Sequence, residues 1–515
     1  MCGIAGWVDW DAEVRQQSSV AEAMMDELAC RGPDDHGSWL SGHAALAHTR
    51  LIVIDRTGGR QPMTIEHHSR SYTMVYNGEL YNTSELRGQL LAKGHRFQGH
   101  SDTEVVLHSY AEWSERCVER FNGIFAFAIW DQEEGQLVLA RDPLGVKPLF
   151  YSDRGRQLVF GSEIKAILCH PGVRAEVDEE GLAEIFAMGP ARTPGHAVFH
   201  GVSELRPGYA ATFSDARGLK LRRYWSLVST DHRDDLATTA DTVRQLVTDA
   251  VRRQLVADVP LATLLSGGLD SSLVTALAKA EFDRRGEPLR TYSVDYEGND
   301  RYFQVNTFQP NADAEYVRLV VDYLNTWHHD VVLNVPALLE ALAIALRGRD
   351  LPGMVDVDAS LYLFSVQVKK GATVALAGEA ADEVFGGYPW SDSDEAIRGR
   401  TFPWIRMVEE RSLLLRPEVR QRIRPVEYVA QRYTDALAEV PRLGGEGERA
   451  ARLRELSYLN LTRFLPILLD RMDRMSMLAG LEVRVPFTDP RLVQYVWNIP
   501  HEVRTCGEMR KGILR

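Results

Sequence analysis

The sequence predicts a mainly antiparallel α+β domain followed by an α/β domain with a doubly wound parallel sheet. Short apolar runs broken by turn residues fill about the first 225 residues, a pattern typical of antiparallel strands with tight turns. After a polar stretch, apolar runs alternate with helical segments, which indicates parallel strands with helical crossovers. From about Ser391 onward the pattern is mostly helical.

Apolar spacing places the elements of the first domain. Strands are predicted at Ala45–His48, Tyr72–Tyr76, Ile124–Trp130, Leu137–Ala140 and Leu158–Phe160. Helical spacing occurs in Ser19–Leu28 and Thr103–Trp113. Two strand candidates within Tyr209–Trp225 flank the turn residues Ser214–Gly218, which predicts a hairpin.

The second domain follows a polar segment, Thr230–Thr238, that we interpret as an interdomain linker. We therefore expect domains at residues 1–229 and 230–515. A helix is predicted around Val243–Leu255, and later helices at Ser272–Lys279, Ala314–Leu324, Pro336–Leu346 and Ser360–Val368. Between them, strands are predicted at Leu261–Leu265, Thr291–Val294, Val331–Leu333 and Val374–Ala377.

Composition excludes several classes of protein. The chain has 515 residues, enough for about two to four domains. With 59 Lys and Arg against 72 Asp and Glu, its net charge of −13 disfavours nucleic acid or an anionic membrane as the main partner. The five cysteines form no CxxC pair, so a reducing compartment is expected. Because the chain has no signal-like N-terminus and no long apolar run, we expect a soluble, cytoplasmic protein. Whether it forms a homodimer is left open by the sequence.

Cys2 is a candidate nucleophile because it directly follows the initiator Met. Its small side chain permits removal of the Met, which would place a thiol and a free α-amine on one residue. The amine, with an ordinary pKa of about 7.7–8.0, can then act as the general base for its own thiol. By position alone, a chance cysteine at a frayed terminus is the simpler interpretation.

Four motifs strengthen the nucleophile hypothesis: RGPDDHG (Arg31–Gly37), HTRLIVID (His48–Asp55), YNGELYN (Tyr76–Asn82) and SDTE (Ser101–Glu104). With Cys2 they resemble the glutamine amidotransferase domain of the N-terminal-nucleophile class, which implies an αββα sandwich. The resemblance implies that Cys2 releases ammonia from glutamine, with Asn77 and the Gly78 N–H as the oxyanion hole. It also implies a glutamine site formed by Arg50, Leu51, Ile52, Val53, Ile54, Glu79 and Asp102. Singly, Asn77-Gly78 is also compatible with an ordinary type I′ turn.

The sequence SGGLDSS (Ser266–Ser272) lies between a predicted strand and a predicted helix. Its glycines, Gly267 and Gly268, allow backbone N–H groups to turn inward toward an anion, and the helix N-terminus adds its dipole. The hydroxyls of Ser266, Ser271 and Ser272 can donate to phosphate oxygens. The chain has no GxxxxGK[ST], which excludes a P-loop NTPase. The loop resembles the pyrophosphate loop of ATP pyrophosphatases, which cleave ATP between its α- and β-phosphates.

Acidic residues follow the predicted strand Val374–Ala377 in GEAADEVFGGYPW (Gly378–Trp390). Glu379, Asp382 and Glu383 therefore lie at the carboxyl end of a parallel strand, where such sheets bind ligands. Mg²⁺ prefers carboxylate and phosphate oxygens, so we expect Asp270 and Asp382 to hold it against the pyrophosphate. A solvated acidic turn is the simpler alternative.

Together with RMDRMSMLAGLEVRVPFTD (Arg471–Asp489) and EMRKGILR (Glu508–Arg515), both halves resemble glutamine-hydrolysing asparagine synthetases. The resemblance implies two active sites joined by an ammonia tunnel, and the amidation of aspartate through β-aspartyl-AMP. It implies that Leu264 and Val294 flank the adenine and that Ala377 and Gly378 contact the nucleotide. Glu379 would be the general base, and Lys511 would neutralise phosphate charge. Arg474, Glu482 and Arg484 are weaker candidates, since each is also compatible with a structural ion pair.

One difference from the family pattern leaves the identity of the acceptor acid open. Ala377 stands where family members usually have serine, so one hydroxyl near the adenylate is missing. An amidotransferase for another carboxylic acid therefore remains the main alternative. A β-lactam-forming relative is disfavoured by Cys2 and Glu379. A non-enzymatic glutamine sensor would not need the phosphate loop, Glu379 and Lys511 together.

Overall fold

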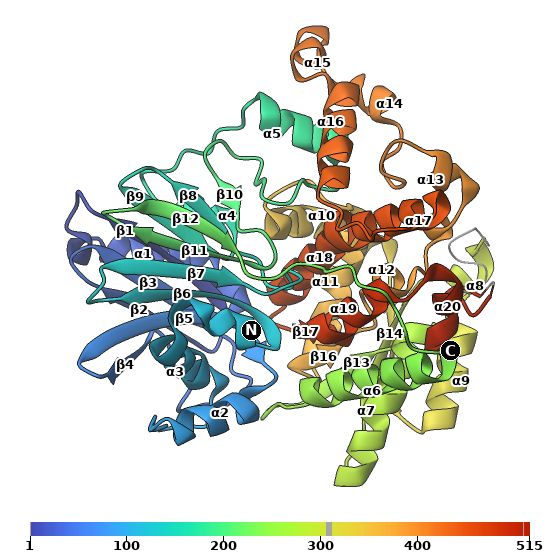
Figure 1. Cartoon of the computed structure of the whole chain (residues 1–515), viewed down its shortest axis with the longest axis horizontal. Coiled ribbons are helices and arrows are strands. Elements are labelled where there is room, and N and C mark those ends of the chain that lie inside the picture. Colours follow the sequence, from blue (N-terminus) through green and yellow to red (C-terminus); the bar gives the residue numbers. More distant parts are fainter. Residues whose placement is uncertain (1, 305–311, 508) are drawn as a thin grey trace.

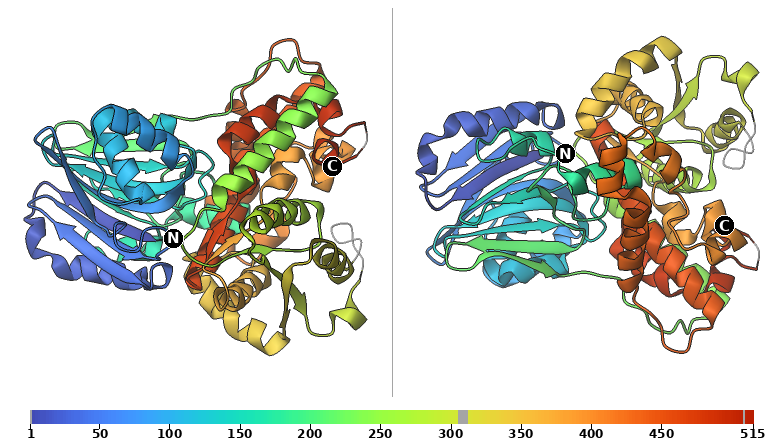
Figure 2. Two further views of the ribbon diagram at one scale, coloured as in Figure 1. Left: turned by 90° about the horizontal axis from the view of Figure 1, so that it is seen from below. Right: turned by 90° about the horizontal axis from the view of Figure 1, so that it is seen from above.

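Two lobes make up the chain in the computed structural model (Figure 1), which describes residues 2–304, 312–507 and 509–515. The first lobe is a sandwich of two antiparallel sheets, and the second is built on a parallel sheet with helices. In both views of Figure 2 the lobes lie side by side, and the chain starts where they meet. Within the described residues, no helix has the length and apolar character needed to cross a membrane.

The sandwich has helices on both outer faces. One sheet has the order β10-β8-β9-β1-β3-β2 and is covered by α1 (Ser18–Glu27) and α4 (Ile164–Leu168). The other has the order β12-β11-β7-β6-β5-β4 and is covered by α2 (Thr83–Ala92) and α3 (Asp102–Trp113). The strands are β1 (Gly3–Asp9), β2 (Asp35–Leu40), β3 (Ala44–Arg50), β4 (Met63–His67), β5 (Arg70–Leu80), β6 (Gly123–Asp131), β7 (Gln136–Arg141), β8 (Phe150–Asp153), β9 (Gln157–Gly161), β10 (Ser203–Glu204), β11 (Tyr209–Ser214) and β12 (Gly218–Arg223). The predicted αββα arrangement is confirmed.

Both faces of β1 are buried, which explains its nearly continuous apolar sequence. Ile4 and Val8 point into the sandwich core, whereas Trp7, one residue out of phase, packs with Met24 and Met25 of α1. Side chains alternate between the two faces of a strand, so a sheet in the middle of four layers needs apolar residues at both parities. This packing fixes the position of Cys2, which directly precedes β1.

The second lobe has a parallel sheet of order β15-β14-β13-β16-β17. Its strands are β13 (Leu261–Leu264), β14 (Arg290–Tyr296), β15 (Trp327–Leu333), β16 (Val374–Leu376) and β17 (Glu482–Arg484). The helices of this region are α5 (Glu179–Ala183, still in the first lobe), α6 (Leu236–Gln254), α7 (Leu269–Arg285), α8 (Asn299–Tyr302), α9 (Asp313–Leu324), α10 (Val335–Arg349), α11 (Asp356–Lys369), α12 (Ala381–Phe385), α13 (Asp394–Arg398), α14 (Val408–Ser412), α15 (Pro417–Ile423), α16 (Pro425–Ala438), α17 (Glu448–Leu459), α18 (Leu465–Leu478), α19 (Pro490–Asn498) and α20 (His501–Arg504). The doubly wound sheet and the mostly helical C-terminal part are confirmed.

One sequence-based boundary is wrong, and six strands were not predicted: β1, β2, β4, β8, β10 and β17. Helix α6 begins at Leu236, inside the predicted linker Thr230–Thr238, because the Asp235 side chain accepts a hydrogen bond from Thr238 N (2.8 Å) and caps the helix. Strand β17 was not predicted at all. It has three residues, two of them charged, and only its pairing with β16 and complete burial make it a strand.

The lobes share an apolar core and buried ion pairs. Val53 and Val146 of the first lobe belong to the same apolar cluster as Val483 of the second. Asp473 on α18 pairs with Lys147 Nζ (3.0 Å) and Arg31 Nη2 (2.8 Å) of the first lobe.

Arg474 belongs to the same buried region. It pairs with Asp350 (2.9 Å) and with Glu163 of the first lobe (3.4 Å). These contacts make Arg474 part of an ion-pair network between the lobes. They favour the structural ion pair over the site role that the sequence also offered for this residue.

Asp473→Asn is expected to lower the free energy of unfolding by about 3–5 kcal/mol, because it leaves the fully buried Lys147 cation without its partner. Denaturant unfolding followed by tryptophan fluorescence measures this loss. The matched control is Asp11→Asn, which breaks an exposed pair with Arg156 and should cost at most about 1 kcal/mol. Equal denaturant midpoints for the two variants would show that the Asp473–Lys147 ion pair does not stabilise the fold.

Candidate active sites

Cys2 lies buried at the junction of the lobes. Its backbone N–H donates to Asn77 Oδ1 (3.1 Å), and its carbonyl accepts from Arg31 Nε (3.1 Å). The sulfur lies 4.0 Å from Leu51 O. Burial raises the pKa of the Cys2 thiol. The thiol is therefore protonated at neutral pH, and nucleophilic attack requires a base that removes its proton.

Asn77 and Gly78 lie inside strand β5, so they do not form the type I′ turn considered from the sequence. Asn77 is fully buried, and its Nδ2 has no hydrogen-bond partner among the described residues. A Cβ at Gly78 would come within 2.3 Å of Ile124 O, so only glycine permits β5 to pack against β6 here. A buried amide donor without a partner is costly unless a ligand uses it, which fits an oxyanion hole.

The other predicted glutamine-site residues are tied to the protein itself. Arg50 Nη2 donates to Asp55 O (2.7 Å), and buried Asp102 accepts from Tyr76 Oη (3.1 Å) and Leu80 N (2.9 Å). Their binding of glutamine stays a prediction.

Glu79 and the segment 51–54 contact the second lobe. Glu79 Oε2 lies 3.3 Å from Arg484 Nη2. Leu51 and Val53 belong to the shared apolar core, with Ile54 packed against it, while Ile52 N donates to Asp34 (2.8 Å). The structure thus connects this part of the predicted glutamine site to β17, which also carries Glu482 (2.6 Å from Arg484 Nε).

A cavity of about 420 Å³ opens at the carboxyl ends of β13, β14 and β16. Its lining includes most of the predicted nucleotide and metal residues: Leu264, Ser266, Gly268, Asp270, Ser271, Val294, Ala377, Gly378, Glu379 and Asp382. Gly267, Ser272 and Lys511 are not among the lining residues. The sequence thus located the edge of the sheet at which this cavity lies.

The loop between β13 and α7 has the backbone geometry expected of an anion site. Gly267 has φ +76°, and a Cβ there would lie 2.7 Å from the Tyr316 side chain. Ser266 Oγ and Ser271 Oγ lie 3.0 Å apart, and the buried Ser272 hydroxyl has no partner among the described residues. Of these three serines, Ser266 and Ser271 line the cavity, so their hydroxyls are the ones placed to donate to phosphate oxygens.

Asp270 and Asp382 come from different strand ends and converge on the side chain of Lys511. Their binding of Mg²⁺ stays a prediction. Lys511 Nζ lies 2.5 Å from Asp270 Oδ2 and 2.5 Å from Asp382 Oδ1. Burial raises the pKa of Asp270 to about 6, and its Oδ1 has no partner in the described parts of the chain. Two carboxylates that already share a positive charge, one with a spare oxygen, fit a Mg²⁺ ion.

Glu379 faces Arg471, with Oε1 3.4 Å from Nη2, and burial raises its pKa. A carboxyl group with a raised pKa suits a general base that works near neutral pH.

The sequence placed Glu383 at the ligand-binding end of a strand but gave it no specific role, and it gave Tyr388 none; both line the cavity. Tyr388 Oη donates to Glu383 Oε1 (2.5 Å), and burial raises the pKa of Glu383 to about 8. Both lie in the segment already singled out, GEAADEVFGGYPW, but their contact depends on the turn after α12.

Two family models match the chain. The model of the glutamine amidotransferase domain matches residues 1–225, and that of asparagine synthase matches residues 242–515. The chain is 51% identical over its full length to asparagine synthetase [glutamine-hydrolyzing] 3 of Bacillus subtilis (strain 168), 84% of which is covered. It is 31% identical to asparagine synthetase B [glutamine-hydrolyzing] of Escherichia coli (strain K12), over 75% of this chain and 65% of that protein.

An amidotransferase domain joined to an asparagine synthase domain defines a glutamine-dependent, amide-forming ligase. The chain belongs to the glutamine-hydrolysing asparagine synthetase family, an ATP-using family, as the full-length match shows.

Proposed function

We propose that the protein converts L-aspartate into L-asparagine through a β-aspartyl-AMP intermediate, with ammonia taken from glutamine. The observation that carries this proposal is the cavity at the sheet edge, where the phosphate loop, the two carboxylates around Lys511 and Glu379 come together. We also propose that the chain divides into its two domains between residues 229 and 230, in the segment between β12 and α6.

The glutaminase half-reaction begins at Cys2. With the initiator Met removed, the α-amine of Cys2 takes the thiol proton, and the sulfur attacks the side-chain amide carbon of glutamine. The unpartnered Asn77 Nδ2 and the Gly78 N–H would stabilise the oxyanion. Ammonia leaves with that proton, and water then hydrolyses the thioester to glutamate. The ammonia passes to the second site along the lobe interface.

At the second site, a carboxylate oxygen of aspartate attacks the α-phosphorus of ATP, and pyrophosphate leaves. Ammonia then attacks the acyl carbon, Glu379 accepts a proton, and AMP departs. The serine hydroxyls of the loop and Lys511 bind phosphate oxygens. Asp270 and Asp382 would hold Mg²⁺, which when bound screens the charge of the pyrophosphate.

Glu379→Gln should keep aspartate-dependent exchange of labelled pyrophosphate into ATP but form amide about 10²–10⁴-fold more slowly, because a base acts only after adenylation. Exchange and amide formation are measured in parallel. Glu395→Gln, on the surface helix α13, is the control and should change neither. Equal loss of exchange and amide formation would contradict a role for Glu379 after adenylation.

A different acceptor acid is the second candidate, since Ala377 lines the cavity and supplies no hydroxyl there. The wild-type enzyme is given ATP, Mg²⁺ and glutamine with aspartate, then with other carboxylic acids. Pyrophosphate release with aspartate supports asparagine synthesis. Release only with another acid would transfer the proposal to that acid and leave the chemistry of both sites unchanged.

A further inference from the structure

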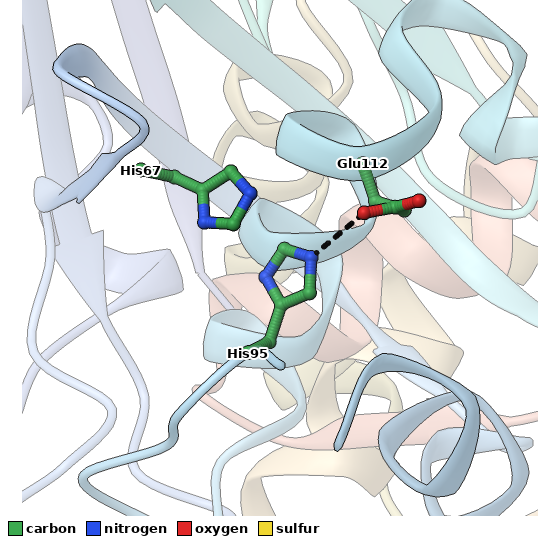
Figure 3. A group of neighbouring side chains, drawn as sticks. All are labelled: His67, His95 and Glu112. Carbon is green, nitrogen blue, oxygen red and sulfur yellow. Dashed lines mark hydrogen bonds and ion pairs between the residues drawn. The ribbon is translucent and has the colours of Figure 1, made fainter. Parts of the chain in front are cut away.

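Three metal-ligand side chains meet on the outer helical layer of the first lobe. His67 is the last residue of the edge strand β4, His95 follows α2, and Glu112 lies in the last turn of α3 (Figure 3). Within the part of the chain that the structure describes, their ligand atoms all lie within 4.8 Å of one another. None of the three belongs to either candidate active site.

His95 is held in place by contacts at both ring nitrogens. It is 3% exposed, its Nε2 lies 3.1 Å from Glu112 Oε2, and its Nδ1 lies 3.0 Å from His108 Nδ1. Only one of two facing imidazole nitrogens can carry the proton. When His95 carries it on Nδ1, the proton is donated to His108 and the Nε2 lone pair is free to bind a metal ion.

His108 can support this tautomer. Its Nε2 lies 4.0 Å from Glu104 Oε1, and Glu104 is itself fixed by hydrogen bonds from Gln98 N (2.7 Å) and Gly99 N (3.0 Å). A metal-bound histidine usually donates its other N–H to a carboxylate, a backbone carbonyl or water, which sets the orientation of the ring; here the acceptor is the imidazole of His108. Glu104 and His108 therefore hold the His95 ring in the orientation that leaves its Nε2 available to a metal ion.

The two remaining side chains are also suited to a cation. Lys93 Nζ binds Glu112 Oε1 (2.7 Å), which leaves Oε2 directed at His95. The His67 ring stacks on the His95 ring, with centroids 4.2 Å apart and planes 10° from parallel. The ring nitrogen of His67 lies within 4.8 Å of the ligand atoms of His95 and Glu112.

We propose that His67, His95 and Glu112 bind a divalent transition-metal ion of the Zn²⁺ type, with His108 as a positioning residue for His95. Two imidazoles and one carboxylate are a zinc-type ligand set. Metal–ligand bonds of ~2.0 Å in a tetrahedron require donors about 3.3 Å apart. The ligand atoms of the three residues lie up to 4.8 Å apart, and rotation of the half-buried His67 side chain would bring its ring nitrogen to the required distance. The ion ties the β4–β5 hairpin to the end of α3.

The test is a titration of chelator-treated full-length protein with Zn²⁺ by calorimetry. Cys2→Ala, Cys30→Ser and Cys506→Ser are combined in the host protein, so that these thiols do not compete for zinc. With excess Mg²⁺ present to fill the proposed site at Asp270 and Asp382, we expect one bound zinc ion per chain and a rise in the thermal midpoint. His67→Gln and Glu112→Gln should each weaken binding at least about 100-fold. His108→Gln should weaken it by about 10–100-fold.

The control is His43→Gln, an exposed histidine of the same lobe, which should bind zinc as the host does. The half-exposed His67 can be replaced without a cavity, and ammonium-dependent amide synthesis confirms that each variant is folded. Absence of stoichiometric zinc binding by the host, or binding kept in both His67→Gln and Glu112→Gln, would overturn the proposal and leave a hydrogen-bonded cluster.

Discussion

Cys2→Ala is expected to abolish glutamine hydrolysis while amide synthesis from ammonium salts continues at the wild-type rate. The substitution removes the sulfur that we propose as the thioester-forming nucleophile, and loss of a nucleophile that acts in a unit typically costs about 10⁶ in kcat. Cys2 does not line the cavity of the second lobe, so the substitution leaves the residues proposed for adenylation and amidation unchanged. Glutamate release and ammonium-dependent amide formation are measured side by side.

Cys30→Ala is the matched control, because Cys30 is an exposed free thiol on the same lobe. It should retain glutaminase activity. Glutamine-dependent synthesis by the Cys2→Ala enzyme would show that the first lobe uses another nucleophile. His48 is not a substitute base for such a nucleophile, since burial lowers its pKa to about 3 and it bonds Tyr76 O instead (3.3 Å).

Asp270→Asn and Asp382→Asn are each expected to reduce pyrophosphate formation about 10³-fold or more, while glutamine hydrolysis survives. Each change removes one of the two carboxylate charges around the cation position, and metal-assisted charge stabilisation is worth several kcal/mol. Pyrophosphate release at saturating ATP is measured across a range of Mg²⁺ concentrations. Partial recovery at high Mg²⁺ is expected, because one of the two carboxylates that we propose as Mg²⁺ ligands would remain.

Asp283→Asn on the same helix as Asp270 is the control for this experiment. Asp283 is exposed and pairs only with Lys279 in the contacts described (2.5 Å), so its loss should leave both activities unchanged. If Asp270→Asn lost glutaminase and synthetase activity equally, the result would indicate unfolding instead of a metal site.

Local signals predicted most of the fold. Strands β3, β5, β6, β7 and β9 of the sandwich, the hairpin β11–β12 and the helices between the parallel strands follow from apolar spacing. The other sandwich strands, β1, β2, β4, β8 and β10, were not predicted. Two of the errors, the missed strand β17 and the start of α6, have a common cause. Strand β17 has two charged residues out of three and is held by pairing with β16, and the start of α6 depends on one capping side chain. Neither leaves an apolar period in the sequence.

The sequence by itself determined the family of the protein, and it predicted the chemistry of the two candidate sites, because Cys2, the serine-rich loop and the acidic segment after β16 carry the candidate reactive groups locally. Only the tertiary structure decided which distant groups share one environment. It placed Lys511 between Asp270 and Asp382, joined Glu79 to Arg484, and brought His67, His95 and Glu112 together. Such pairings depend on burial and on contacts between residues far apart in the chain, and the free energy of a buried charge depends on all its neighbours at once.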